Sequence, residues 1–398
     1  MNGLEWLFWI GLAIPFYSYI GYGLLLWFLV TGKRTFAKRP ASGQAVSEPP
    51  AVTLLIAAYN EIDQVILKMK NCRELVYPKE KLNIVWVTDG SDDGTAEALR
   101  AYADVRVLHQ AERNGKIAAV NRAMPFITTP LVIFSDANTM LNPMAVVNLV
   151  RHFQDARVGC VSGEKRILEL RHDHAAGAGE GLYWRYESRL KKWDAELYSA
   201  VGAAGELFAV RTALYPAVAK DTVLDDFVIS LKIAMQGYRI AYEPDAYAVE
   251  VSSADMGQEL KRKIRISAGG IQAVIRLRAL LQPWKYGLFS FQYISHRVLR
   301  WSLAPIGLLL LLPVNLALAW PSPGFYRVFF YLQALFYLSA LCGWLLEKRH
   351  IRFKLLFVPY YFLFMNYAVL RGLGRYVSGR QSTLWEKVQR GELRTNPA

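Results

Sequence analysis

Long uncharged stretches lie near both ends of the chain. Leu7–Val30 contains no charged residue, and its 24 residues are enough to cross a bilayer core of about 30 Å. Near the C-terminus, Trp301–Trp320 is uncharged, Phe325–Leu346 carries only Arg327, and Leu355–Leu370 is a shorter apolar stretch. This pattern predicts three or four membrane-spanning helices.

The cations beside these stretches give conflicting orientations. Gly32-Lys33-Arg34 follows the first stretch, so the excess of Lys and Arg on cytoplasmic flanks places it in the cytoplasm and the N-terminus outside. Four spans would then leave the C-terminal tail outside, although this tail is rich in cations, namely Arg371, Arg375, Arg380, Lys387, Arg390 and Arg394. Either Leu355–Leu370 is re-entrant or interfacial, or the tail departs from the preference of Lys and Arg for the cytoplasmic side.

Between Ala51 and Asp255, short apolar runs alternate with segments of helical character. The runs interpreted as buried strands are Val52–Ala57, Ile84–Val87, Val105–Leu108 and Leu131–Phe134. The helical segments include Gln64–Cys72, Thr95–Ala103 and Lys116–Met124. Such alternation predicts a mostly parallel sheet with helices on both faces, in which ligands bind beyond the carboxyl ends of the strands.

Polar clusters follow three of these predicted strands. They are Ala58-Tyr59-Asn60-Glu61, the segment Thr88–Thr95 (TDGSDDGT), and Ser135-Asp136-Ala137-Asn138. Each cluster by itself is typical of a turn or a helix cap. Three clusters at one edge of a sheet favour a binding site instead.

Five motifs in this order resemble the inverting glycosyltransferases of family 2. They are A-Y-N-E at 58–61, D-G-S-D-D-G-T at 89–95, G-K-I-A-A-V-N at 115–121, S-D-A-N at 135–138 and L-D-D at 224–226. The similarity covers Val52 to Ile266 and extends to the membrane-bound synthases of cellulose, hyaluronan and poly-N-acetylglucosamine. It implies an α/β fold of the GT-A nucleotide-sugar-binding type, with a mostly parallel mixed sheet flanked by transmembrane and interfacial helices.

The resemblance also implies how a nucleotide-sugar donor is held. Tyr59 would provide an aromatic face for the base, and Glu61 and Asp89 would accept hydrogen bonds from the uracil or the ribose. Lys116 matches a lysine near the nucleotide or its phosphates. Each also has a simpler structural interpretation, such as a packed surface aromatic for Tyr59 or a solvated first-turn lysine for Lys116.

A divalent cation, Mg²⁺ or Mn²⁺, is the cofactor that the resemblance implies. Asp136 would ligate it where it bridges the diphosphate and neutralises the charge of the leaving group. The family motif is D-x-D, whereas this chain has Asn138 at its second ligand position. An amide oxygen ligates these cations without charge, so a weaker metal affinity is expected.

The catalytic base implied by the resemblance is Asp226. An inverting transfer needs a carboxylate that takes the proton of the acceptor hydroxyl. Asp225 stands where the family usually has Glu, and the alternative is that both acids cap the helix beginning near Phe227. Glu206, in the small-residue segment Val201–Glu206, is a weaker candidate for contact with the acceptor.

A second departure from the synthase pattern lies downstream. Processive relatives carry Q-x-x-R-W where this chain has Arg262-Lys263-Ile264-Arg265-Ile266. Arg265 would clamp the diphosphate, Arg262 replaces the glutamine and is assigned to donor binding, and Ile266 replaces the tryptophan that stacks on the acceptor sugar. Processive polymerisation is therefore in doubt. Trp301, beside Arg300, is interpreted as an anchor at the membrane interface.

The charge distribution separates the chain into two parts. The 398 residues include 47 Lys or Arg and 33 Asp or Glu, and 53% are apolar, which excludes a disordered basic protein. Met256–Arg300 holds nine Lys or Arg and one acid, and Glu347–Ala398 holds ten and three. Elsewhere there are 28 cations and 29 acids, so no basic face for nucleic acid is expected. Three cysteines build no disulfide scaffold.

These observations divide the chain into an N-terminal transmembrane helix (1–31), a linker (32–50), a cytoplasmic catalytic domain (51–255), amphipathic interface helices (256–300), transmembrane helices (301–372) and a basic tail (373–398). The expected protein is a multi-pass enzyme of the cell (inner) membrane. It would move a hexose or N-acetylhexosamine from a UDP-linked nucleotide sugar to a lipid-linked or saccharide acceptor.

Two alternatives remain open beside this limited transfer. One is a processive polysaccharide synthase, for which three or four spans would form a thin channel unless oligomerisation adds helices. The other is a catalytically weak membrane scaffold that binds nucleotide, which Asn138 suggests. A dinucleotide-binding enzyme is not expected, because no G-x-G-x-x-G follows the first strand.

Overall fold

The computed structural model describes residues 2–36, 48–168, 175–253, 255–321, 324–349, 351 and 353–381, with side chains at 175–183 excluded. Most of the predicted linker at 32–50 and of the basic tail at 373–398 lies outside the described residues.

The centre of the molecule is one mixed sheet of eight strands in the order β3-β2-β1-β4-β7-β6-β8-β5. The strands are β1 Val52–Ala58, β2 Leu82–Asp89, β3 Val105–Gln110, β4 Leu131–Asp136, β5 Met140–Leu141, β6 Val158–Leu168, β7 Leu207–Arg211 and β8 Arg239–Val251. The four predicted strands are confirmed, and β1 to β4 pair in parallel. Strand β7 runs antiparallel to both β4 and β6, and β8 is parallel to β6.

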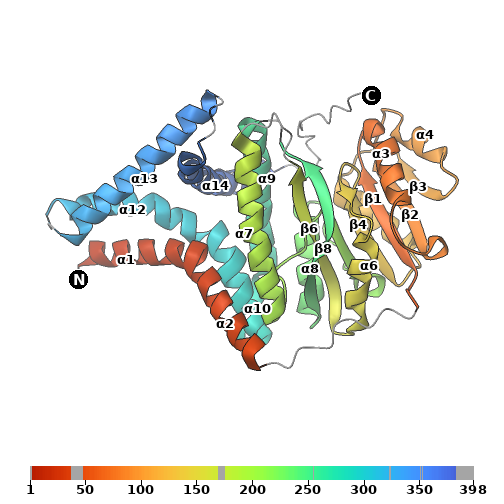
Figure 1. The fold of residues 1–398 in the computed structure, drawn as a ribbon, viewed down its shortest axis with the longest axis horizontal. Helices are drawn as coiled ribbons and strands as arrows, with labels where there is room; N and C mark the ends of the chain where they lie inside the picture. Colours follow the sequence, from red (N-terminus) through yellow and green to blue (C-terminus); the bar gives the residue numbers. More distant parts are fainter. Residues whose placement is uncertain are drawn as a thin grey trace.

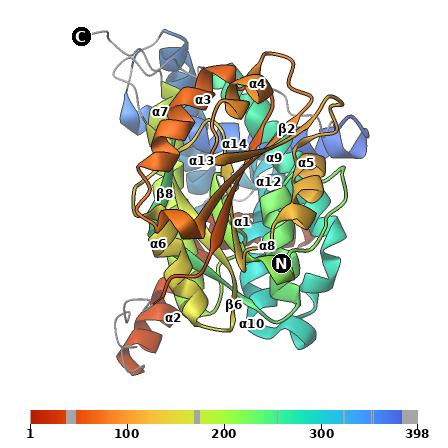
Figure 2. The ribbon, with the colours of Figure 1, turned by 90° about the vertical axis from the view of Figure 1, so that its right-hand side faces the viewer.

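Both faces of the sheet are covered, which explains the uninterrupted apolar runs. Leu55 and Ala57 of β1 belong to one core cluster, while Leu54 and Ile56 belong to another, because successive side chains of a strand point to opposite faces. Helices α5 (Lys116–Ala123) and α8 (Asp225–Met235) pack on one face, and α3 (Ile62–Arg73), α4 (Thr95–Arg100) and α6 (Ala145–Val150) on the other (Figure 2).

The strand register brings the predicted motifs to one edge of the sheet. Ala57 lies opposite Asp136, and Ala58 lies opposite Thr88. The segments that follow β1, β2 and β4 therefore leave the sheet at the same edge. This placement confirms that the three polar clusters share one edge, as the sequence predicts.

The remaining helices gather on the side away from β1–β3, as Figure 1 shows. They are α1 Gly3–Phe16, α2 Tyr22–Phe36, α7 Ala175–Leu197, α9 Met256–Arg276, α10 Pro283–Tyr293, α11 Leu299–Trp301, α12 Leu303–Ala319, α13 Phe325–Lys348 and α14 Lys354–Val377. Within the described residues, three helices are long and apolar enough to cross a membrane, namely Gly3–Thr35, α13 and α14. A fourth is possible if Pro283–Trp301 and α12, which meet at a 48° bend, form one span.

The segment 256–300 differs from the predicted pair of interface helices. Ala273 and Leu277 on or next to α9, and Phe289 and Tyr293 of α10, are buried in the same core cluster as Leu55 of β1. Apolar side chains of this segment thus belong to the core of the sheet domain. Helices α9 and α10 are walls of that domain, and the domain boundary predicted at 255 is not a break in the core.

Helix α14 packs closely against α9 at a glycine. A Cβ built on Gly372 would lie 2.6 Å from Cβ of Ser267 and 2.9 Å from the backbone nitrogen of Ala268. Such distances allow no side chain unless the helices separate. Gly372 therefore fixes the distance between α14 and α9.

We expect Gly372→Val to destabilise the protein by about 1–3 kcal/mol, the usual cost of overpacking a tight contact. Thermal unfolding of the detergent-purified chain measures the effect. Gly374→Ala is the matched control, because a Cβ there meets nothing within 4 Å. An alanine in a helix is also more favourable than glycine by roughly 0.5–1 kcal/mol. Equal melting temperatures for Gly372→Val and the parent protein would contradict this packing.

Candidate active site

A cavity of about 650 Å³ lies at the motif-bearing edge of the sheet. It is lined by nearly all of the predicted site residues, which are Tyr59, Glu61, Lys116, Asp136, Asn138, Glu206, Asp225, Asp226, Arg262 and Arg265. A larger hollow of about 850 Å³ lies at the opposite ends of the strands, near Thr53, Leu82 and Val105. We assign the site to the first cavity, because ligands of such sheets bind at the carboxyl ends of the strands.

The loop after β1 is tied to the loop after β2. Asn60 has a left-handed backbone (φ 52°), its side chain donates to Asp92 at 2.8 Å, and its backbone N–H donates to Oγ of Ser91 at 3.0 Å. The Arg113 guanidinium lies over the Tyr59 ring, 3.8 Å from its centre. The predicted role of Tyr59 in base stacking therefore involves a ring that already has one cation on a face.

Asp89 is buried behind the cavity lining. Its two carboxylate oxygens accept the backbone N–H groups of Asn114, at 2.8 Å, and Gly115, at 2.7 Å. Gly115 has φ 92°, a conformation that favours glycine, and α5 begins at the next residue. In this structure Asp89 thus positions the turn that carries Lys116, and its hydrogen bonds to a base or ribose remain a prediction.

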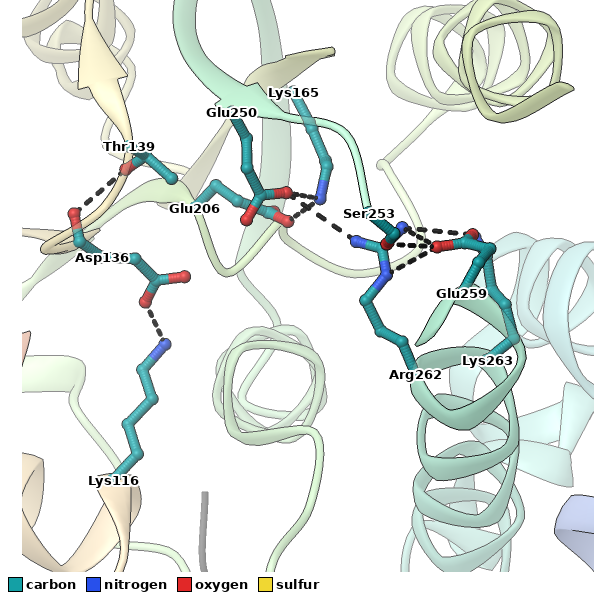
Figure 3. Close-up of polar contacts among 10 residues, drawn as sticks. All are labelled: Lys116, Asp136, Thr139, Lys165, Glu206, Glu250, Ser253, Glu259, Arg262 and Lys263. Atoms are coloured by element: carbon teal, nitrogen blue, oxygen red, sulfur yellow. Dashed lines mark hydrogen bonds and ion pairs between the residues drawn. The ribbon is translucent and has the colours of Figure 1, made fainter. Parts of the chain in front are cut away.

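Asp136 and Lys116 form an ion pair at the centre of the cavity, with 2.5 Å between the Lys116 Nζ and Asp136 Oδ1 atoms. Figure 3 shows the lysine reaching Asp136 from below. Burial raises the pKa of Asp136, and the Lys116 charge opposes this shift. Burial would lower the pKa of Lys116, but Asp136 and Asp225 raise it well above its usual value. Lys116 therefore stays charged and compensates the carboxylates.

A buried lysine that the sequence did not single out supports the same loop. Lys68 of α3 is fully buried, and its ammonium donates to Oγ of Ser135 at 2.8 Å and to the carbonyl of Thr139 at 2.5 Å. These bonds hold both ends of the segment that contains Asp136 and Asn138. The sequence does not indicate that Lys68, within the predicted helix Gln64–Cys72, is buried, because an isolated lysine on a helix is usually solvated.

The donor set for a divalent cation is small. Among the residues that the structure describes, no group of three or more His, Cys, Asp or Glu side chains lies close enough to hold a metal ion. Asp136 and Asn138 supply oxygens at the cavity wall. One or two protein ligands completed by phosphate oxygens and water are what Mg²⁺ commonly uses, so these residues fit a cation that binds together with the donor.

Asp225 and Asp226 are the first residues of α8, but the N-cap residue is Leu224 and no side chain makes a capping hydrogen bond, so the helix-cap alternative is wrong. Both acids line the cavity. A Cβ built on Gly205 would lie 3.1 Å from Oδ2 of Asp226, so the small-residue segment directly covers this carboxylate. Burial, and then the neighbouring Asp225, raise the pKa of Asp226 to about 7. A carboxylate with this pKa is suited to general-base catalysis at neutral pH.

An ionic network extends from the cavity floor to α9 (Figure 3). The buried Lys165 ammonium lies between Glu206, at 2.5 Å, and Glu250. Arg262 is 3.7 Å from Glu250 and 2.9 Å from Glu259 of its own helix. Burial would raise the pKa of Glu206, and Lys165 reverses this and lowers it. Glu206 and Arg262 thus have structural partners, and their predicted roles with substrates are additional to these.

Part of the cavity lining was missed by sequence reasoning. These residues include Trp184, Glu187, Lys191, Arg297, Trp301, Met365 and Val369. Trp301 was interpreted as an interfacial anchor, but the structure places its ring against Phe227, next to Asp226, with 5.2 Å between the ring centres. Its position could not be read from the sequence, because it depends on the bend between α11 and α12.

A buried Asp-containing cavity beyond the carboxyl ends of a mixed α/β sheet is the arrangement of a GT-A glycosyltransferase. The mannosyltransferase PcManGT from Pyrobaculum calidifontis, solved in complex with GDP-Man and Mn²⁺, shares the fold with a TM-score of 0.70 at 23% identity, over 94% of this chain and 99% of that one. The family model "Glycosyltransferase like family 2" matches residues 49–269, more than half of the chain. The chain belongs to this family and is a glycosyltransferase.

Curated relatives agree with this assignment. A poly-β-1,6-N-acetyl-D-glucosamine synthase of Staphylococcus aureus (strain MSSA476) is 28% identical over 241 residues, which are 58% of this chain and 57% of the relative. The synthase of the same name from Staphylococcus epidermidis is 25% identical over 235 residues, 56% of each chain. The match thus spans little more than half the length of these relatives.

The pKa of Asp226 predicts the pH dependence of turnover. A general base acts only when it is deprotonated, so we expect kcat/KM to fall as the pH decreases through about 7. Asp225→Asn removes the neighbouring charge that contributes to raising this pKa, and should move the acidic limb to lower pH. Asp63→Asn, an exposed acid in the first turn of α3, should leave the limb in place. If the acidic limbs of the kcat/KM profiles of Asp225→Asn and the parent enzyme coincide, the assignment of Asp226 as the general base is contradicted.

Proposed function

We propose that the enzyme transfers N-acetylglucosamine from a UDP-linked donor to a glycan acceptor at the membrane, in the synthesis of a cell-surface polysaccharide. The observation that carries this proposal is the continuous cavity that joins Asp136 and Lys116 at the donor end to Asp226. The choice of sugar rests on the curated relatives, which are named as poly-β-1,6-N-acetyl-D-glucosamine synthases.

In the proposed reaction Asp226 accepts the proton of an acceptor hydroxyl while that oxygen attacks the anomeric carbon of the donor. The bond from this carbon to the diphosphate breaks on the opposite face, which inverts the configuration. Gly205 lies close to the base, and a Cβ there would be 3.1 Å from Oδ2 of Asp226, so a side chain at this position would crowd the carboxylate. Asp225 adds to the negative charge that raises the basicity of Asp226.

The leaving diphosphate gains negative charge as the bond breaks. Lys116 is positioned to neutralise it, because donor binding at Asp136 would free the ammonium for the phosphates. Asp136 and Asn138 would hold a divalent cation that neutralises the diphosphate when bound. Arg265, on the cavity wall contributed by α9, is assigned to the same oxygens, since a guanidinium binds phosphate through two parallel hydrogen bonds.

A test of this proposal is sugar-nucleotide consumption by the full chain in membranes. UDP-GlcNAc, UDP-Glc, UDP-Gal and GDP-Man are compared, and UDP-GlcNAc should be consumed fastest. Asp226→Asn should lower turnover by about 10²–10⁴-fold, the usual contribution of a general base, and leave UDP affinity near that of the parent. Asp63→Asn is the control, being an exposed acid in a comparable helical position. Normal turnover by Asp226→Asn would refute the base.

The membrane arrangement is also proposed, from packing and orientation. Phe8 of α1 is buried against Leu311 and Val314 of α12, and α1 and α12 lie alongside each other and run antiparallel in Figure 1, where α14 is viewed nearly along its axis. Met365 of α14 lines the catalytic cavity, which must stay accessible to a water-soluble donor. We therefore propose that α1, α12 and α13 cross the bilayer and that α14 lies along its cytoplasmic surface.

Three spans place the C-terminal tail with the catalytic domain and remove the conflict over its cations. Cysteine labelling tests this in a Cys342→Ser background, because Cys72 and Cys160 are buried. A membrane-impermeant maleimide should label Gly3→Cys in intact cells and Ser378→Cys only after permeabilisation, both sites being exposed. Labelling of Ser378→Cys in intact cells would instead indicate four spans.

A further inference from the structure

One lysine of the cavity wall is buried without a bonded partner. Lys191 of α7 lines the cavity and is 3% exposed. Among the residues whose side chains the structure describes, none forms an ion pair or a hydrogen bond with its ammonium group. Buried charges in proteins are nearly always paired, because an unpaired charge is costly to desolvate. Lys191 is therefore a candidate for pairing with a ligand.

Two lysines beside it show the usual arrangement. Three ammonium groups lie near the Trp184 ring, at 5.3, 5.7 and 5.7 Å from its centre, and belong to Lys165, Lys191 and Lys263. Lys165 has a carboxylate at 2.5 Å, and Lys263 has one at 3.4 Å. Lys191 lies as close to the ring, but no carboxylate of the described residues binds it. The comparison singles out this ammonium group at the cavity wall.

The acid that attracts Lys191 most is shared with two arginines. Glu187 has the largest electrostatic effect on Lys191 among the acids, but its carboxylate lies 2.5 Å from Arg297 and 3.4 Å from Arg300. Burial would raise the pKa of Glu187, but Arg297 leads the cations that lower it well below its usual value. One negative charge thus faces three positive charges.

A buried histidine leaves this surplus in place. Nδ1 of His296 lies 2.5 Å from Asp194, and Nε2 lies 3.3 Å from Glu187. An ionised carboxylate only accepts hydrogen bonds, so both ring nitrogens carry protons. The charge of the imidazolium then offsets that of Asp194, and the cations around Glu187 still exceed the carboxylates.

The pKa of Lys191 reflects the same imbalance. Burial lowers it, and the attraction of Glu187, Glu164 and Glu206 does not reverse the shift. An anion bound beside the ammonium group would supply the missing attraction. A phosphate group carries a charge of about −1.5 to −2 at neutral pH, which matches the surplus of two positive charges around Glu187.

The walls around Lys191 indicate where such a group would come from. Helix α7 contacts both α9 and α14, and Met365 and Val369 of α14 line the same cavity. In the proposed membrane arrangement, α14 lies along the bilayer surface. A buried cation next to an apolar wall at this surface suits the phosphate group of a lipid whose chain remains in the bilayer.

We propose that Lys191 forms a second phosphate site, which binds a phosphate group of the acceptor. This site is separate from the donor end, where Lys116 pairs with Asp136. Lys191 and Asp226 line one cavity, so a ligand held by its phosphate at Lys191 would present a sugar hydroxyl to the base. The assignment rests on the proposed function, because it names a chemical group of the second substrate.

Equilibrium binding to the full chain in phosphatidylcholine nanodiscs tests this site without turnover. UDP and Mg²⁺ are kept saturating, and radiolabelled farnesyl phosphate and inorganic phosphate are titrated separately. Farnesyl phosphate should bind, and Lys191→Met should weaken its affinity about 10- to 100-fold, the scale of a hydrogen bond to a charged group. Lys191→Arg should retain binding. Lys192→Met is the matched control, because Lys192 is the next residue of α7 and is exposed.

Thermal unfolding separates a lysine that binds a ligand from one that stabilises the fold. Lys191→Met should keep its affinity for UDP, and without phosphate it should melt at the temperature of the parent protein or above it, since a buried charge has been removed. A lower melting temperature would assign Lys191 a structural role and overturn the proposal.

The two phosphate probes distinguish the source of the group. Weaker binding of inorganic phosphate than of farnesyl phosphate supports a lipid-borne acceptor, and equal Lys191-dependent binding supports a soluble one. Failure of the parent protein to bind either probe, or equal affinities of the parent and Lys191→Met, would overturn the site. If phosphate binding depends on Lys191 but no donor is consumed, the proposed transfer fails and the phosphate site stands.

Discussion

Several carboxylates can share one buried cavity only because lysines lie among them. Asp136 is paired with Lys116, and Glu206 and Glu250 are paired with Lys165. Unpaired charges at this depth would be far too costly to desolvate. The distribution of cations then differentiates the acids. At Asp226, burial and the neighbouring Asp225 outweigh the attraction of Lys116 and raise the pKa to about 7, whereas at Glu206 the Lys165 charge outweighs burial and lowers the pKa.

This cavity is built jointly by the catalytic domain and the apolar helices. Helix α9 contributes Arg262, Arg265 and Ser267 to the cavity, and Ser267 also packs against Gly372 of α14. Trp301 reaches the cavity from the segment that leads into α12. A change in the packing of the apolar helices therefore reaches the cavity directly. These helices are consequently part of the cavity wall.

The sequence predicted well that the motif residues gather at one edge of the sheet, and it missed much of the remaining cavity lining, for a physical reason. Asp89, Lys116 and Asp136 follow strands or open helices, and parallel pairing brings such positions together whatever the rest of the fold does. Lys165 and Glu250 lie on the long strands β6 and β8, and their proximity depends on a parallel pairing between segments far apart in the sequence, which no local pattern indicates. The position of Trp301 depends on the bend between α11 and α12. Lys68 looks like any solvated helical lysine until the sheet is in place.

The position of Trp301 changes what Ile266 implies about chain length. Loss of the motif tryptophan argued for limited transfer, on the premise that the aromatic surface is lost with it. Gly270 removes that premise, because a glycine one turn after Ile266 lets an indole from another helix lie on the same face of α9. Retention of a growing glycan requires a surface in the right place, and does not require that one particular residue supply it. The substitution at 266 by itself therefore does not decide between limited and processive transfer.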